Sequence, residues 1–144
     1  GAGEEAQALR QYCSDQGLRD VHFLGFRNQS ELPRYYAIAD VFILPSENEP
    51  WGLVINEAMC AGVAVVATEE VGAVADLVWP GENGMLYPAR DIAALTVVLR
   101  GLVRDPYRCR RMGQRSREIF AEWSYDRCVE GVRTALRSVA DRQR

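Results

Sequence analysis

Two glutamates, Glu49 and Glu57, flank the pair Gly52–Leu53 in the most informative stretch of the chain, Pro45–Met59. Carboxylates accept strong charge-assisted hydrogen bonds, so they are good partners for sugar hydroxyls. A glycine at a helix start lets the backbone come close to a ligand. The free N–H groups and the positive dipole end of that helix attract phosphate. Gly52 and Leu53 are placed for the phosphate role.

A strand before this motif and a helix after it would position these groups, and the sequence predicts both. Val41–Leu44 is an unbroken apolar run, typical of a parallel strand that is covered on both faces, and a helix is expected from about Gly52 to Cys60. Ligands of open α/β sheets bind beyond the carboxyl ends of the strands. We therefore expect the loop Ser46–Gly52 and the helix start to line a cleft there, with Glu49 accessible to solvent.

The other expected elements alternate between strands and helices and then become helices only. Strands are predicted at Val21–Gly25, Val63–Thr68 and Gly84–Tyr87, and helices at Glu4–Gln16, Glu31–Ala39 (capped by Ser30), Val71–Val78, Ile92–Val103 (capped by Asp91), from Pro106 to about Glu122, and from Ser124 to about Val139. This order predicts an α/β fold, a doubly wound Rossmann-like parallel sheet with a helical C-terminal tail. Four strands are few for such a sheet, so a further strand is expected before Gly1.

Composition narrows the function classes. The length of 144 residues suits one domain. A net charge of -3 argues against a nucleic-acid partner. All 17 basic residues are arginine, so any step that needs a lysine must take it from sequence outside these residues. The single histidine and the absence of C-x-x-C spacing argue against a metal site. No signal peptide or membrane span is visible. Isolated cysteines are expected to be small core residues in a reducing cytoplasm, and there are four of them, Cys13, Cys60, Cys109 and Cys128.

The stretch E-P-W-G-L-V-I-N-E-A-M places Glu49 and Glu57 in an E-x7-E pattern, and it resembles the retaining GT-B glycosyltransferases of family 4, group 1. The flanking segments VHFLGF, ADVFILPS, GVAVVAT and GENGMLY also fit, in the right order. The resemblance covers nearly the whole chain. It implies that residues 1–144 are the C-terminal, nucleotide-sugar-binding domain, truncated at its N-terminus and separated from an acceptor-binding N-terminal domain.

The resemblance also implies roles for individual residues of the motif. Glu57 matches the glutamate that holds the ribose hydroxyls of the donor nucleotide. Glu49 matches the catalytic-site glutamate that contacts hydroxyls of the transferred sugar. Gly52 and Leu53 match backbone donors to the diphosphate. Trp51 either stacks on a ligand or shapes the loop by packing.

Outside the motif, the resemblance places Phe26 and Arg27 in the lining of the base pocket. It also shows departures. The family usually has two adjacent glycines and a glutamate where this chain has Gly72, Ala73 and Asp76. The arginine and lysine that grip the donor phosphates lie on the first strand and loop of the family's domain, and both are missing here.

By this resemblance, the parent protein is an enzyme that transfers a sugar from a nucleoside-diphosphate sugar to a hydroxyl of a sugar or lipid-linked acceptor. The configuration at the anomeric carbon is retained, and no metal or other cofactor is expected. The isolated chain is expected to be inactive in transfer. Alternatives are a non-catalytic nucleotide-binding module, a nucleotide-sugar epimerase, and an NAD domain suggested by the G-x-G-x-x-A spacing of Gly1–Ala6. The arginines between Arg104 and Arg117 form either a solvated helix face or a contact with the missing domain or an anionic membrane surface.

Overall fold

The first of two compact units in the chain, Gly1–Tyr35, contains little regular structure. The computed structural model describes residues 3–142, so the first two residues of the Gly1–Ala6 stretch lie outside the described residues. Helix α1 spans Ala6–Asp15, and α2 spans Leu32–Tyr36. The prediction of a strand at Val21–Gly25 is wrong: no strand forms there, and Val21 and Leu24 are about half exposed. A strand needs a hydrogen-bonded neighbour, and the sheet of the second unit does not include this segment.

The second unit, Tyr36–Arg144, is built on a three-stranded parallel sheet. Its strands are β1 (Val41–Leu44), β2 (Ala64–Thr68) and β3 (Gly84–Tyr87), in the order β1-β2-β3. Parallel neighbours require crossover connections, and helices α3 (Leu53–Ala61) and α4 (Val74–Leu77) lie in them. These three strands were expected from the sequence, and the structure confirms them.

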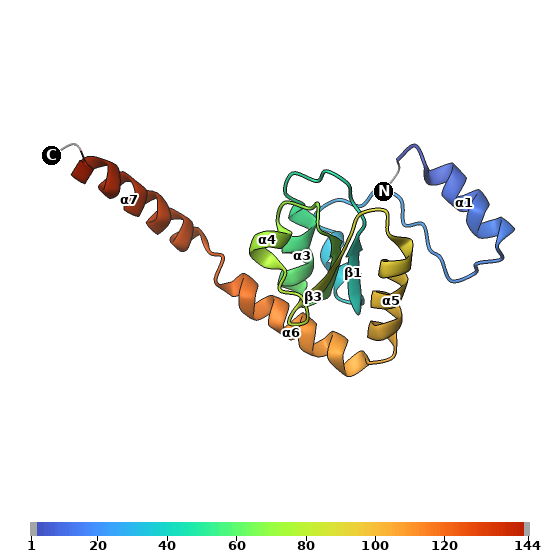
Figure 1. Ribbon diagram of the computed structural model, residues 1–144. Coiled ribbons are helices and arrows are strands. Elements are labelled where there is room, and N and C mark those ends of the chain that lie inside the picture. Colours follow the sequence, from blue (N-terminus) through green and yellow to red (C-terminus); the bar gives the residue numbers. More distant parts are fainter. Residues whose placement is uncertain (1–2, 143–144) are drawn as a thin grey trace. The chain divides into compact units, whose positions relative to one another are not determined.

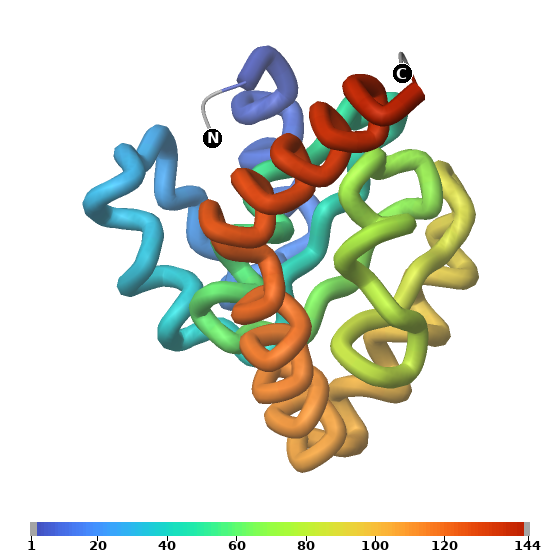
Figure 2. The backbone as a smooth tube through the Cα atoms, turned by 90° about the vertical axis from the view of Figure 1, so that its left-hand side faces the viewer, coloured from blue at the N-terminus to red at the C-terminus, as the bar shows by residue number. Residues whose placement is uncertain are grey.

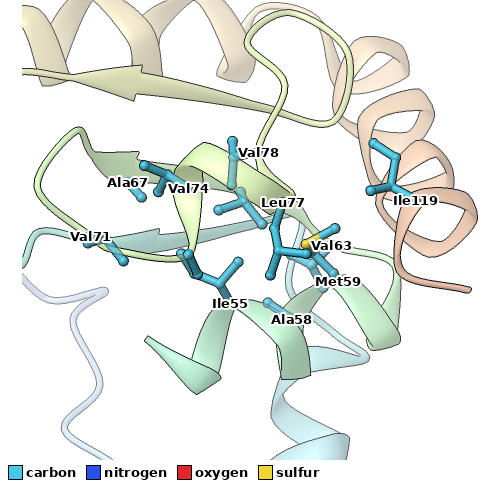
Figure 3. Close-up of a cluster of buried hydrophobic side chains, with 12 residues drawn as sticks. Ile55, Ala58, Met59, Val63, Ala67, Val71, Val74, Leu77, Val78 and Ile119 are labelled. Carbon is cyan, nitrogen blue, oxygen red and sulfur yellow. The ribbon is translucent and has the colours of Figure 1, made fainter. Parts of the chain in front are cut away.

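Both faces of the sheet are covered, as the apolar runs predicted (Figure 1). Every residue of β2 is buried, and its side chains alternate between two clusters. Val65 and Ala67 pack with α3, α4 and Ile119, as Figure 3 shows for the labelled residues of that cluster. Ala64 and Val66 pack on the other face, with α5 (Ile92–Val103) and α6 (Pro106–Ala121). The predicted α/β fold is confirmed.

Helix α3 is fixed at its C-terminal end by α6 (Figure 2, orange). Gly62 ends α3 in the left-handed conformation, where glycine is favoured. Arg117 of α6 donates to the Ala61 carbonyl over 2.9 Å, and a positive charge is favourable at that end of a helix. Gly113 lets α6 approach closely, because an added Cβ would lie 2.0 Å from the Gly62 carbonyl oxygen.

The helical C-terminal tail is also present. Asp91 and Asp105 cap α5 and α6 through their side chains, and Pro106 begins α6. Helix α7 spans Tyr125–Arg142 and contains no buried residue. In the part of the chain that the structure describes, no helix is long and apolar enough to cross a membrane.

The prediction that the cysteines are core residues holds for only one of them. Cys109 is buried, Cys13 is half-buried, and Cys60 and Cys128 are exposed. Helical periodicity explains the difference at Cys60, because the buried positions of α3 are Ile55, Ala58 and Met59. Cys60 follows them on the opposite side of the helix.

Candidate functional site

The loop between β1 and α3 lies beyond the carboxyl end of β1, as the motif predicted. Two side-chain contacts tie it to the neighbouring strands. The buried hydroxyl of Thr68, at the end of β2, donates to the Ser46 carbonyl. Arg90, which follows β3, donates to one oxygen of Glu47 through Nη2 at 2.6 Å and Nε at 2.8 Å. The hydrogen bond from Arg90 is the main cause that holds the pKa of the Glu47 carboxyl below its usual value.

Glu49 lies in this loop, and its backbone is paired with the segment that follows β2. It forms a parallel bridge with Val71, and its carbonyl accepts from the Gly72 N–H over 2.9 Å. The Ala73 N–H donates to the Trp51 carbonyl, also over 2.9 Å. The Glu49 side chain is half-buried, and one of its oxygens accepts weakly from the Trp51 N–H at 3.4 Å. Glu49 is thus partly accessible, whereas a cleft lined by the whole loop stays a prediction.

Gly52 makes the turn from this loop into α3. It has φ 87 and ψ 59, a left-handed conformation that few other residues adopt. It is also enclosed, because an added Cβ would lie 2.9 Å from Cγ1 of Val71 and 3.3 Å from Cδ2 of Leu44. No side chain caps the helix there. The N–H groups of Leu53 and Val54 therefore stand at an uncapped helix N-terminus, which is favourable for an anion.

Glu57 lies one turn further into α3 and is half-buried. Its carboxylate accepts a hydrogen bond from the Tyr36 hydroxyl over 2.9 Å. Burial first, and then the Glu57 carboxylate, raise the pKa of Tyr36 far above its usual value of 10.0. Tyr36 is not among the site residues expected from the sequence. No spacing signal could have found it, because it lies 21 positions from Glu57 and meets it only through the fold.

Trp51 is engaged on two sides. Its indole N–H donates to the side-chain oxygen of Asn56 over 3.2 Å, and its ring lies 6.4 Å from that of Trp123 at an angle of 54°. It also packs against the cluster drawn in Figure 3. These contacts favour the packing alternative for Trp51. Beside it, a pocket of about 680 Å³ is lined by Asn56 and by residues from the end of α6 to the first turn of α7.

Phe26 and Arg27 belong to the first unit. Phe26 is 78% exposed. Arg27 forms an ion pair with Glu31 at 3.3 Å, and its guanidinium lies 5.6 Å from the Tyr35 ring. The two residues line a pocket of about 240 Å³ together with Leu24, Gly25, Leu32 and Tyr35. Their assignment to a base pocket stays a prediction.

The carboxyl edge of the sheet is acidic. The segments that follow the three strands contain four glutamates, Glu47, Glu49, Glu69 and Glu70, and a single arginine, Arg90. Asp76, which stands where the resembling family has a glutamate, is exposed on α4. Residues 3–142 contain no group of three or more side chains that could hold a metal ion. The cations at this edge are therefore few, and the uncapped start of α3 is its main positive feature.

Comparison with known families and proteins gives a consistent result. The family described as "Glycosyl transferases group 1" matches residues 1–119. The glycogen synthase of Mycobacterium tuberculosis (strain ATCC 25618 / H37Rv) is 35% identical over 120 residues, which are 81% of this chain and 29% of that protein. The GDP-mannose-dependent alpha-(1-6)-phosphatidylinositol monomannoside mannosyltransferase of the same organism is 32% identical over 146 residues, covering 95% of this chain and 38% of that protein.

Solved structures show the same fold. Sucrose-phosphate synthase from Thermosynechococcus elongatus aligns with a TM-score of 0.81 and 30% identity, over 96% of this chain and 35% of that one. Anabaena HepE, solved in complex with UDP-glucose, aligns with a TM-score of 0.72 and 30% identity, over 83% of this chain and 33% of that one. The chain thus spans about a third of the length of these relatives.

Proposed function

Since the chain belongs to the group 1 glycosyl transferases, we propose that it forms the donor-binding part of a retaining glycosyltransferase that uses a nucleoside-diphosphate sugar. The observation that carries this proposal is the segment at the carboxyl edge of the sheet, where an uncapped helix start lies between two partly accessible carboxylates. Relatives described as GDP-mannose-dependent or solved with UDP-glucose support the donor class. The acceptor hydroxyl is held by a part of the protein outside these residues.

Each part of the motif then has one task. The diphosphate binds at the uncapped start of α3, through the N–H groups of Gly52 and Leu53. Glu57 accepts hydrogen bonds from the ribose hydroxyls, and Glu49 accepts them from the transferred sugar. When the bond from the sugar to the diphosphate breaks, negative charge builds up on the leaving phosphate. The helix dipole stabilises that charge without a metal ion.

The charge at the carboxyl edge limits how firmly these residues alone can bind a donor. The carboxyl edge has four glutamates and one arginine, so further basic groups are needed to hold a diphosphate firmly. The four cysteines form no disulfide, which fits a reducing compartment, and we place the protein in the cytoplasm. We expect the 144-residue chain to bind donor nucleotides weakly and to transfer no sugar.

The test is sugar transfer by the longest natural protein that contains this sequence, with UDP-glucose and GDP-mannose offered as donors. Glu57→Ala and Glu49→Ala should each lower kcat/KM at least about a hundredfold, because each removes charge-assisted hydrogen bonds worth roughly 1.5–3 kcal/mol apiece. The matched control is Glu130→Ala on the exposed helix α7, which should change it less than twofold. Unchanged transfer in both motif variants would refute the proposal. Nucleotide binding without transfer by the wild-type protein would favour the non-catalytic module instead.

A further inference from the structure

The hydrogen bond between Tyr36 and Glu57 joins two distant parts of the second unit. Tyr36 is the first residue of that unit, just before β1, and Glu57 lies in the middle of α3. The phenol donates to Oε2 of Glu57 over 2.9 Å, and both side chains are half-buried. Among residues 3–142, no other side chain hydrogen-bonds this carboxylate. Its second oxygen, Oε1, therefore has no partner within the described protein.

Packing holds the Tyr36 ring in place. The ring meets Phe42 edge to face, with the centroids 5.7 Å apart, and it packs against the core cluster that includes Met59. Edge-to-face contact of this kind fixes the direction of an aromatic side chain. The hydroxyl is thus supported from β1 and from the core. Tyr36 is a rigid donor, whereas a glutamate on a helix surface ordinarily samples several rotamers.

The phenol is also a permanent donor. Its pKa lies far above 10.0, first because the group is buried and second because the Glu57 carboxylate is adjacent. At neutral pH the hydroxyl keeps its proton, so one oxygen of Glu57 stays engaged. A carboxylate held by one oxygen presents the other in a fixed direction. This costs less entropy on binding than a free side chain would.

From this geometry we propose that Tyr36 is a positioning residue: by holding Oε2 of Glu57, it aims Oε1 at the ribose hydroxyls of the donor nucleotide. The inference rests on the proposed function, in which Glu57 recognises ribose. Tyr36 itself touches no ligand, and it acts only through the direction of the carboxylate. Its loss should therefore weaken the discrimination between ribose and deoxyribose more than it weakens phosphate binding.

The experiment compares UDP with 2'-deoxy-UDP as ligands of the 144-residue chain, with affinities measured by NMR titration up to millimolar concentrations. The wild-type chain should prefer UDP about tenfold, the usual effect of one hydrogen bond to a charged group. Tyr36→Phe keeps the ring and removes only the hydroxyl. It should reduce the preference to about threefold while changing the affinity for 2'-deoxy-UDP less than twofold. Tyr107→Phe is the matched control, since it removes an exposed hydroxyl on α6, and it should keep the full preference.

Two further variants separate failure of this inference from failure of the proposed function. If Glu57→Ala abolishes the preference and Tyr36→Phe leaves it intact, Tyr36 has no positioning role, although Glu57 keeps its own. If Glu57→Ala leaves the preference intact, or the wild-type chain shows none, this inference fails together with the ribose role of Glu57, and the transfer test described above decides the proposed function separately. An equal loss of affinity for both nucleotides in Tyr36→Phe would indicate a structural role and would overturn the inference. The double variant should show the same preference as Glu57→Ala alone, because Tyr36 acts only through Glu57.

Discussion

Gly72 is the residue that lets the segment after β2 lie against the motif loop. An added Cβ there would lie 2.0 Å from the Pro50 carbonyl oxygen, so Gly72→Ala must push the two segments apart. The two backbone hydrogen bonds that Glu49 and Trp51 accept from this segment would then lengthen. We expect a loss of about 1–3 kcal/mol in the free energy of unfolding, as in other overpacked sites. Urea denaturation followed by circular dichroism measures it.

The matched control for this prediction is Gly101→Ala. Gly101 lies in α5 and has no atom within 4 Å of an added Cβ. Alanine is the better helix former, so this variant should gain roughly 0.5–1 kcal/mol. If both alanine variants change stability by the same amount, close approach at Gly72 is not the reason for its glycine.

At the residue scale, local features of one segment could be predicted from the sequence, whereas contacts between side chains of different elements could not. Gly52 was expected at the helix start, and its left-handed backbone and enclosed position explain why glycine is needed. The contact between Tyr36 and Glu57, and the ion pair between Glu47 and Arg90, join residues from different elements. Neither pair has a spacing pattern, because the distance along the chain is set by crossover connections rather than by helix or strand periodicity.

At the scale of whole elements, α6 contributes much more to stability than α7 does. Helix α6 buries Cys109, Met112, Gly113, Ser116 and Ile119, whereas α7 buries none of its residues. A chain that ends at Ser124 should therefore melt within about 2 °C of the complete chain. A chain that ends at Asp105 should be unfolded, because burial of large apolar side chains such as Met112 and Ile119 contributes about 1.5–3 kcal/mol each and total stability is typically only 5–15 kcal/mol. Melting curves of the two shortened chains test this. A large drop on removing α7 alone would contradict it.

Element prediction succeeded where periodicity and capping agreed. Ile92–Val103 was expected with the same bounds that α5 has, because Asp91 caps it and an apolar stripe runs along it. The helix predicted over Val71–Val78 is too long. Helix α4 covers only Val74–Leu77, and Val71 instead pairs with Glu49. Val21–Gly25 has the composition of a strand but forms none. Whether an apolar run becomes a strand depends on a partner that its own sequence does not encode.

For the whole molecule, the charge composition makes the pH dependence of stability in the alkaline range simpler to interpret. The chain has no lysine, so the side chains that titrate in the alkaline range are cysteines and tyrosines. Three of these have a raised pKa in the folded chain. Burial is the first cause for each of them, Tyr36, Tyr87 and Cys109. Each group remains protonated in the folded chain at a pH where the unfolded chain has already lost the proton.

The sign of the resulting pH dependence follows from this difference. A group with a raised folded pKa contributes its full stability below the unfolded pKa and loses it as the pH rises through the interval up to the folded pKa. The unfolded values are about 9.0 for the thiol and 10.0 for the phenols. The free energy of unfolding should thus be constant up to about pH 8.5 and then fall. Each of these groups contributes a slope of up to about 1.4 kcal/mol per pH unit. Urea denaturation between pH 7 and pH 11 measures the curve.

Tyr36→Phe should flatten this decline above pH 10, because phenylalanine has no proton to lose in the unfolded chain. Tyr107→Phe is the control, since it removes the hydroxyl of a tyrosine that is 65% exposed on α6. The same two variants serve the nucleotide experiment, so one pair of proteins tests the burial of the Tyr36 hydroxyl and its action on Glu57 separately. Equal slopes above pH 10 in Tyr36→Phe and in the wild-type chain would mean that the hydroxyl is neither buried nor held against the Glu57 carboxylate in solution. In that case the positioning role would lose its structural basis, whatever the ribose preference proved to be.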